Sequence, residues 1–98
     1  MNDMTRPLAL PVPSTLEAFL RRRLLAQLAP LQGGRLQLRD ALGDVSLGDA
    51  DAPLQVTVWV DNPAFYRAVG AQGSVGAGEA YIRGEWRCDN LVGLVQLL

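Results

Sequence analysis

The segment LQVTVWV at residues 54–60 constrains the fold more than any other part of the chain. Its apolar side chains alternate with Gln, Thr and Trp, which is the period of two that a half-buried β-strand requires. Four apolar residues share one face, which must pack against other apolar groups: Leu54, Val56, Val58 and Val60. Trp59 lies on the opposite face, which we expect a helix or another domain to cover. The domain is therefore built around a sheet with at least one buried face.

Helices are predicted on either side of this strand. Residues 14–17 (STLE) match the capping box that begins a helix, and apolar residues recur after it at helical spacing as far as Leu28. This first helix is expected to end just beyond that residue. The second helix begins at residues 61–63 (DNP), where a capping side chain precedes a proline at the first helical position. Gly70 or Gly73 is expected to stop it.

Further strands and a last helix complete the predicted fold. Residues 35–39 and 45–47 alternate with period two on either side of a turn, so they are predicted to form a hairpin. Residues 85–88 are predicted to be a short strand, and an apolar helix follows over residues 91–98. These elements indicate a single α+β domain over residues 14–98, with a small, mainly antiparallel sheet flanked by helices.

The two ends of the sequence carry separate expectations. Residues 1–13 contain three prolines and are predicted to be an extended lead-in rather than a signal peptide. The helix over residues 91–98 is apolar up to its last residue, which would leave its end uncovered. We therefore expect the sequence to be one domain of a longer protein.

Length and composition exclude several classes of protein. The chain has 98 residues, of which 49% are hydrophobic and 19% charged, so it has the composition of a globular domain with one core. The absence of His removes the usual general base and the common zinc ligand. One Cys excludes an internal disulfide and fits a cytoplasmic location. The net charge of -1 gives no reason to expect a nucleic-acid partner, and no apolar run is long enough to span a membrane.

The glycine-rich stretch GSVGAGEAYIRGEW at residues 73–86 has two interpretations. Its closely spaced glycines suggest a loop that binds a phosphate, but a dinucleotide fingerprint has the order GxGxxG directly after a strand. Here the order is GxxGxG after a predicted helix, and the chain has no lysine for a P-loop. The favoured interpretation is a tight turn between a helix and a strand, in which glycine allows the backbones to approach closely.

A run of arginines on the first helix is the clearest functional signal in the residues themselves. Arg21, Arg22 and Arg23 lie on an amphipathic helix, so they are candidates for contact with anionic lipid headgroups. Residues 1–39 hold six of the nine arginines but only two of the ten acidic residues. The alternative for the run is a solvated face, or pairing with the acidic remainder of the chain.

The other candidate residues favour structural roles. Glu79 and Glu85 could act as an acid–base pair, but capping and surface roles are favoured because no base or pocket accompanies them. Tyr81 and Trp86 are expected to be core or interface aromatics rather than groups that stack on a substrate. Cys88 is expected to be a small buried residue, since no neighbour would activate it as a nucleophile.

Three sequence blocks together resemble a known family. They are residues 62–69 (NPAFYRAV), 73–81 (GSVGAGEAY) and 84–91 (GEWRCDNL). The chain resembles the N-terminal region of the cyclopropane-fatty-acyl-phospholipid synthase family of S-adenosylmethionine-dependent methyltransferases, over about residues 34–98. In that family an Asn-Pro-x-Phe helix start leads to the run Gly-x-Leu-Gly-x-Gly-Glu-x-Tyr-Met-x-Gly-x-Trp. Val75 and Ile82 replace the usual Leu and Met, and Arg83 stands at a position that is often acidic.

The resemblance implies an accessory role for this chain. The family's cofactor-binding and catalytic residues lie in a following methyltransferase domain, so no catalytic, cofactor or metal residue is assigned here. That domain would bind S-adenosylmethionine and transfer a methylene group to an unsaturated acyl chain of a phospholipid. This chain would dock the enzyme on the inner face of the membrane, form a homodimer, or present lipid to the catalytic domain. Candidate contacts with that domain are Tyr81, Trp86, Leu94 and Leu98.

The predicted order of elements also resembles sterol-carrier-type lipid-binding domains. This likeness implies an apolar groove lined by the terminal helix and by Leu54, Val56, Val58 and Val60. It leaves a second interpretation open, in which the chain is a free-standing lipid-binding module.

Overall fold

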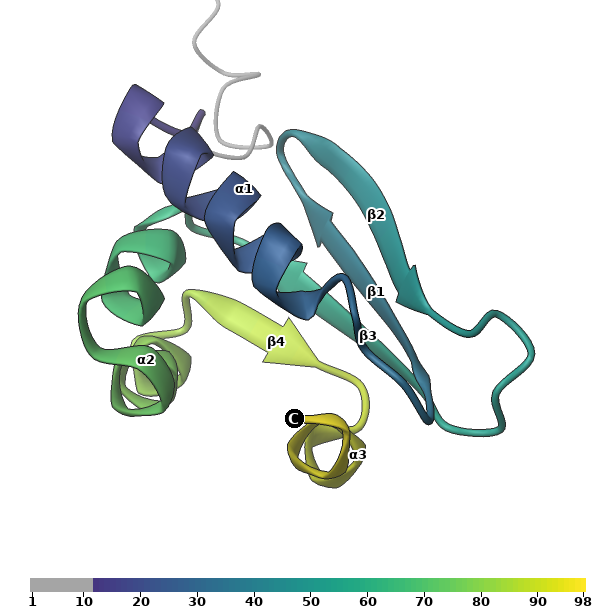
Figure 1. The fold of residues 1–98 in the computed structure, drawn as a ribbon. Helices are drawn as coiled ribbons and strands as arrows, with labels where there is room; N and C mark the ends of the chain where they lie inside the picture. Colours follow the sequence, from purple (N-terminus) through teal and green to yellow (C-terminus); the bar gives the residue numbers. More distant parts are fainter. Residues whose placement is uncertain (1–11) are drawn as a thin grey trace, which may run out of the picture.

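A computed structural model describes residues 12–98, and its elements form an α+β fold (Figure 1). The elements in chain order are α1 (Thr15–Leu28), β1 (Arg35–Asp40), β2 (Gly43–Gly48), β3 (Gln55–Val60), α2 (Ala64–Ile82), β4 (Trp86–Cys88) and α3 (Leu91–Leu97). The predicted fold class, first helix, hairpin and central strand are confirmed. Most of the predicted lead-in, residues 1–11, lies outside the described residues.

The four strands form one mixed sheet in the order β2-β1-β3-β4. β1 pairs antiparallel with β2, and β3 with β4, whereas β1 and β3 run parallel. The parallel pair arises because the loop after β2 crosses the beginning of β1. There the Asp49 amide donates to the Gly34 carbonyl at 3.0 Å, and the Arg35 amide donates to the Leu54 carbonyl at 2.9 Å. The sheet thus contains a parallel pair within its largely antiparallel arrangement.

The hydrophobic core lies between the sheet and the helices, which pack on one of its faces (Figure 1). The inward residues of β3 are almost fully buried, as their alternation predicts, and Val56 is 1% exposed. Phe65 and Tyr66 come from the start of α2, and their rings meet edge to face at 5.1 Å. Trp86 of β4 joins them, with its ring 5.8 Å from that of Phe65. These aromatic contacts attach the edge strand to α2.

Helix α1 begins as its sequence predicts but does not close the core over its whole length. Ser14 and Glu17 form a reciprocal capping box, with hydrogen bonds of 3.2 and 2.9 Å. The Glu17 carboxylate also pairs with Arg67 of α2 at 2.8 Å. The first apolar residues of the helix stay in contact with water, with Leu16 55% and Phe19 45% exposed. Polar contacts therefore hold the N-terminal part of α1, where apolar burial is limited.

The prediction that the second helix ends at Gly70 or Gly73 is wrong, and only the last part of the glycine-rich stretch forms the predicted turn. Helix α2 continues through Gly73 to Ile82, with a kink at Gly73, where φ is 57° and ψ is -129°. Glycine adopts this backbone conformation at little cost because it has no Cβ atom. Beyond the kink, Gly76 lies against the first half of the helix, where a Cβ atom would overlap the carbonyl oxygen of Ala68. The turn that leads to β4 comes later, at Gly84, with φ 76°.

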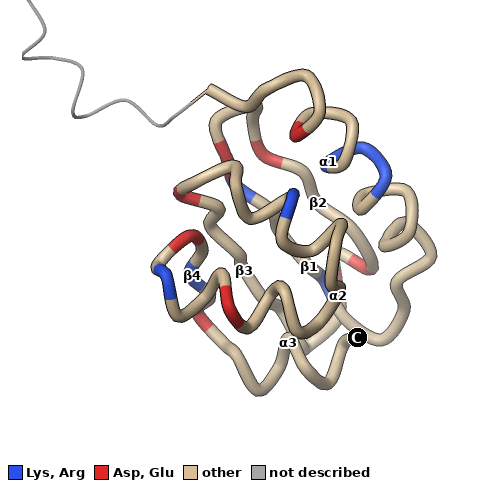
Figure 2. The backbone as a smooth tube through the Cα atoms, turned by 90° about the vertical axis from the view of Figure 1, so that its left-hand side faces the viewer, with Lys and Arg blue, Asp and Glu red and all other residues tan. Residues whose placement is uncertain are grey.

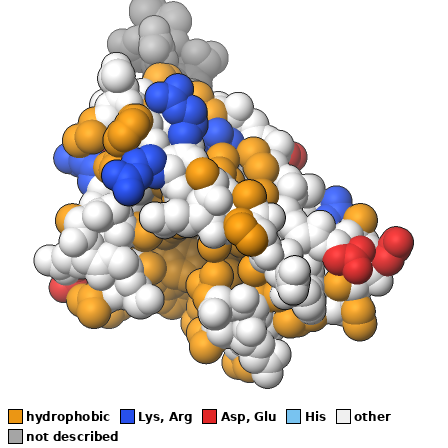
Figure 3. Space-filling model, viewed as in Figure 1, with side chains coloured by type: hydrophobic (Ala, Val, Ile, Leu, Met, Phe, Trp, Pro, Cys, Tyr) orange, Lys and Arg blue, Asp and Glu red, His pale blue; other side chains and the backbone are white. Residues whose placement is uncertain are grey.

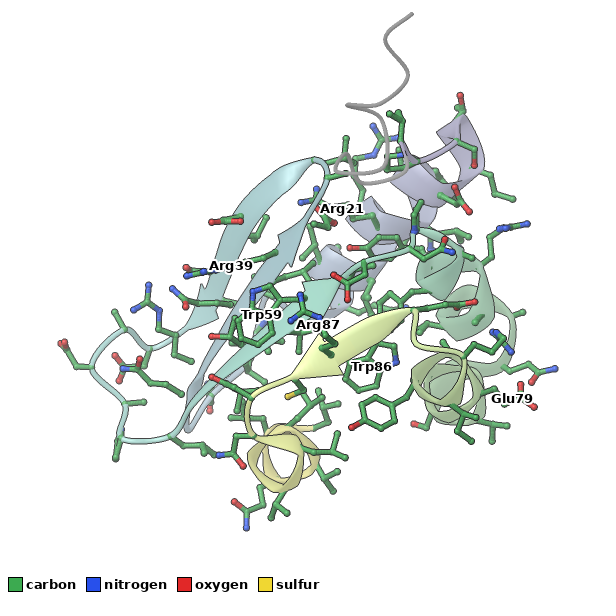
Figure 4. The ribbon with its side chains drawn as sticks, turned by 180° about the vertical axis from the view of Figure 1, so that it is seen from behind. Arg21, Arg39, Trp59, Glu79, Trp86 and Arg87 are labelled. Carbon is green, nitrogen blue, oxygen red and sulfur yellow. The ribbon has the colours of Figure 1, made fainter. Side chains whose placement is uncertain are left out.

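The opposite face of the sheet carries no helix among residues 12–98 (Figure 4). Trp59 lies on it, and the guanidinium carbon of Arg87 is 5.1 Å from the centroid of its ring. Asp61 accepts two hydrogen bonds from the same guanidinium, at 2.7 and 3.1 Å. The expected helix is therefore not found within residues 12–98, and an arginine from the neighbouring strand covers part of Trp59. Within the described range, no helix is long and apolar enough to cross a membrane.

Candidate functional site

An apolar cavity of about 240 Å³ lies between the helices and the inner face of the sheet. Leu36, Leu38 and Val58 line it from β1 and β3, and Figure 3 shows a hollow with an apolar floor. Leu24 and Leu28 line it from α1. These two leucines are only half-buried, because the cavity lies beneath them in place of close-packed side chains. The core is therefore incompletely filled under the C-terminal half of α1.

Helices α2 and α3 form the remaining walls of the cavity. The kink of α2 falls at this wall, where Gly73, Ser74 and Ala77 all line the space. Leu94 and Leu98 line it from the C-terminal helix. Ser74 has the one hydroxyl group among these lining side chains, and none of them is charged. A largely apolar lining with few polar groups is what a binding site for an apolar ligand requires.

Trp86 forms an aromatic wall whose polar atom is already satisfied. Its indole Nε1 donates a hydrogen bond to the carbonyl oxygen of Ala77 at 2.9 Å. The ring of Tyr81 meets it at 5.0 Å, and the Trp86 side chain is 7% exposed. Because its N–H is occupied, Trp86 offers the cavity an apolar ring surface.

The cavity matches the predicted groove only in part. Val58 and α3 line it as expected, but Leu54, Val56 and Val60 do not. Val56 and Val60 are 1% and 3% exposed because neighbouring side chains cover them. Leu54 packs under α3 instead, so close that a Cβ atom on Gly93 would approach it to 2.9 Å.

The four residues expected to contact a following domain occupy different environments. Trp86 and Leu94 are buried and line the cavity, with exposed fractions of 7% and 9%. Leu98 lines the same cavity but is 73% exposed, so it lies at its rim. Tyr81 is 45% exposed and does not line the cavity. Only Tyr81 and Leu98 therefore present extensive surface to a second domain.

The three successive arginines of α1 also differ in environment, although they form one basic segment along the chain (Figure 2). The Arg21 side chain is 12% exposed, and its Nε donates to the Asp40 carboxylate at 2.6 Å. Tyr66 donates its hydroxyl to the same carboxylate oxygen. Arg21 thus joins α1 to the hairpin and is not available to a headgroup. Arg22 and Arg23 are exposed.

The hydrogen bonds that Asp40 accepts from Arg21 and Tyr66 stabilise the fold and do not form a reaction centre. Asp40 ends β1 with a side chain that is 3% exposed, and the Leu42 amide donates to its second oxygen at 3.0 Å. Burial, followed by the hydrogen bond to Asp40, raises the pKa of Tyr66 well above its usual value. The phenol therefore stays protonated and donates throughout the physiological range.

The remaining candidates offer no nucleophile or acid–base pair. Glu79 is exposed on α2 (Figure 4), whereas Glu85 is 9% exposed and accepts from Arg83 Nε at 2.9 Å. Neither carboxylate lines the cavity. Burial raises the pKa of the Cys88 thiol, which packs against the core. Residues 12–98 contain no cluster of His, Cys, Asp and Glu suited to a metal ion.

Comparison with known proteins identifies no family for this chain. It matches no protein-family model, no curated protein and no solved structure.

Proposed function

We propose that this chain is a lipid-binding accessory domain that takes an acyl chain into its apolar cavity. The observation that carries this proposal is the cavity itself, which is open, uncharged and about 240 Å³ in volume. An apolar cavity of about 150 Å³ holds benzene, so by proportion this one holds roughly ten carbon atoms. The ligand it suits is a flexible hydrocarbon chain of that length, or the equivalent part of a longer one.

The energetics favour a ligand over an empty cavity. The rim leaves apolar surface in water, including the half-buried Leu24 and Leu28 and the exposed Leu98. Each methylene group buried there contributes about 0.8 kcal/mol. Ten methylenes would therefore contribute about 8 kcal/mol before the costs of ordering the chain and of association. With an association cost of about 4 kcal/mol, at the low end of its range, about 4 kcal/mol remains, which corresponds to binding in the millimolar range.

We further propose that the domain is the non-catalytic N-terminal part of a cyclopropane-fatty-acyl-phospholipid synthase-like methyltransferase. The support is the resemblance carried by residues 62–91, together with a cavity suited to the same class of substrate. In such a parent, S-adenosylmethionine and the transfer of the methylene group belong to a separate catalytic domain. This domain would contact phospholipid at the inner face of the membrane and present an acyl chain, or contact a second copy of itself.

A free-standing lipid-binding module would use the same cavity without a catalytic partner. The two assignments differ in whether methyl transfer depends on this domain. We expect the 98-residue chain alone to bind lipid but to show no methyl transfer to vesicles of unsaturated phospholipid. Turnover by this chain alone would contradict the accessory role. If a parent methyltransferase lacking this domain kept full activity on vesicles, the free-standing module would be favoured.

The binding test uses Trp86 as a reporter, because its ring lines the cavity. The chain has two tryptophans, so Trp59→Phe leaves Trp86 as the single fluorophore. Decanoic acid brominated at its last carbon should quench Trp86 saturably, since bromine quenches indole only at close contact. Unsaturable quenching, equal to that given by a short brominated acid, would contradict the proposal.

A pair of variants on neighbouring residues controls this test. Ser74 lines the cavity, whereas Val75 is 66% exposed and does not line it. We expect Ser74→Phe to fill part of the cavity and weaken binding about tenfold, and Val75→Phe to leave it unchanged. Equal affinities for the two variants would place the ligand elsewhere. Circular dichroism and urea unfolding establish that both variants are folded.

A further inference from the structure

A second, smaller groove of about 160 Å³ lies between α1 and α2 beside the apolar cavity. Leu24 and Val69 line both spaces, so the two meet at these side chains. The groove differs in chemistry, because Arg23 and Gln27 also line it. Leu24 and Val69 thus separate the apolar cavity from the charged and amide groups of the groove, which an elongated ligand in the cavity would reach by extending past these two side chains.

The groove follows from local features of the two helices. Arg23 and Gln27 are four residues apart, so they lie on the same face of α1, one turn from each other. Across the groove, Gly70 of α2 lacks a side chain, and a Cβ atom there would approach Leu20 to 3.1 Å. The glycine thus keeps open a space that a larger residue would narrow.

Among the described residues, the Arg23 guanidinium forms no ion pair that would stabilise the fold. Within residues 12–98, the ion pairs involve five other arginines: Arg21, Arg39, Arg67, Arg83 and Arg87. Arg22 is also outside these pairs, but it lines neither the groove nor the cavity. Arg23 is therefore the arginine of this run that combines an uncommitted charge with a position beside the apolar space.

We infer that Arg23 and Gln27 form the headgroup subsite for an anionic amphiphile whose chain occupies the apolar cavity. The inference rests on the proposed function and specifies its ligand. A guanidinium donates two parallel hydrogen bonds to the oxygens of a carboxylate or phosphate. The Gln27 amide donates to a third oxygen of a phosphate, or to a remaining lone pair on a carboxylate oxygen. The ligand class is a hydrocarbon chain of about ten carbons or more that ends in one of these anions.

The test compares ligands that carry different headgroups on the same ten-carbon chain. Isothermal titration calorimetry would measure the affinity of the protein for decanoate, decyl phosphate and decanol, with inorganic phosphate alone as a fourth probe. The measurements are made at low salt, where exposed charges are least screened. We expect both anionic amphiphiles to bind about tenfold more tightly than decanol, and inorganic phosphate to bind too weakly to measure. Tighter binding of decyl phosphate would identify a phospholipid head as the natural ligand, and tighter binding of decanoate a free fatty acid.

Adjacent arginines give a matched pair of variants. Arg23→Gln should remove the preference for the anionic head and leave decanol binding unchanged, while Arg22→Gln should preserve the preference. Equal affinity of wild-type protein for decanol and decanoate would overturn the headgroup subsite but leave the acyl cavity intact. An equal loss of preference in both variants, or strong binding of phosphate alone, would also overturn it. Failure of every chain-bearing probe to bind would refute the acyl cavity itself, and the subsite with it.

Discussion

Two alanine substitutions in the second half of α2 should change stability in opposite directions. Gly76 and Gly78 are two residues apart, and neither has a positive φ angle. A Cβ atom at Gly76 would overlap the carbonyl oxygen of Ala68, whereas a Cβ atom at Gly78 would meet nothing within 4 Å. The pair thus separates the steric effect of the added methyl group from its effect on helix propensity.

The magnitudes follow from these two surroundings. Replacing Gly by Ala within a helix stabilises it by about 1 kcal/mol, and Gly78→Ala should show this full gain. At Gly76 the same gain is opposed by an overlap with backbone, which cannot rotate away as a side chain can. Overpacking of this kind costs about 3 kcal/mol at the upper end of its usual range. The net change for Gly76→Ala is therefore a loss of about 2 kcal/mol.

Urea unfolding followed by tryptophan fluorescence measures both effects, because Trp86 is buried against α2. With a slope of about 1.5 kcal/mol per molar urea, the midpoint should fall by roughly 1.3 M for Gly76→Ala and rise by roughly 0.7 M for Gly78→Ala. A Gly76→Ala midpoint at or above that of the wild type would refute the close packing of the two halves of α2. It would also remove the structural reason for the kink at the cavity wall.

Two further predictions concern the polar contacts that hold α1. Tyr66→Phe removes the hydroxyl that donates to the buried Asp40 carboxylate and should lower the free energy of unfolding by about 2 kcal/mol. Tyr81→Phe, at an exposed ring, should change it by less than about 0.5 kcal/mol, and equal losses would contradict the network. The backbone amide of Ser14, together with Arg67, lowers the pKa of Glu17 below its ordinary 4.5. The ionised carboxylate therefore stabilises the fold above pH 4.5, and this stabilisation is lost as the pH falls further. Glu17→Gln keeps the capping box and should cost about 1 kcal/mol at pH 7 and progressively less below pH 4.5, whereas a cost independent of pH would refute the electrostatic explanation.

Elements with a single strong periodicity could be predicted from the sequence. The alternation of residues 54–60 identifies β3 and its buried face, and residues 14–17 identify the start of α1. Both signals are local, because they depend on side chains within a few residues of one another. The parallel pairing of β1 with β3 is not local, since it depends on how the loop after β2 crosses another strand.

The glycine-rich stretch shows why glycine residues are an unreliable signal for the end of a helix. Glycine is unfavourable within a helix, so Gly73 and Gly76 indicate a break when the sequence is considered alone. In the fold, Gly73 provides the backbone angles of a kink and Gly76 allows the two halves of α2 to meet. Tertiary packing therefore keeps helical a segment whose intrinsic preference is weak. Nothing in the sequence distinguishes a glycine that ends a helix from one that folds a helix back on itself.

The cavity could be predicted only in part because its residues resemble ordinary core residues. Leu24 and Leu28 recur at the spacing of any buried helix face, and only their half-buried state in the fold reveals the space beneath them. The same limit applies to Arg23, which the sequence does not separate from its neighbours Arg21 and Arg22. Their roles diverge because successive residues on a helix point about 100° apart, so one meets Asp40, one meets solvent and one lines the groove.

The position of α1 connects its polar contacts with the proposed ligand site. Its N-terminal half is held by Glu17, which pairs with α2, and by Arg21, which pairs with the hairpin. Its C-terminal half carries Leu24 and Leu28 over the cavity, where close packing is missing. A helix held at one end and weakly packed at the other can move away from the sheet at its C-terminal half without losing its anchors. The cavity is already open at the surface (Figure 3), so entry of an acyl chain requires at most a rearrangement of half-buried leucines rather than unfolding of the core.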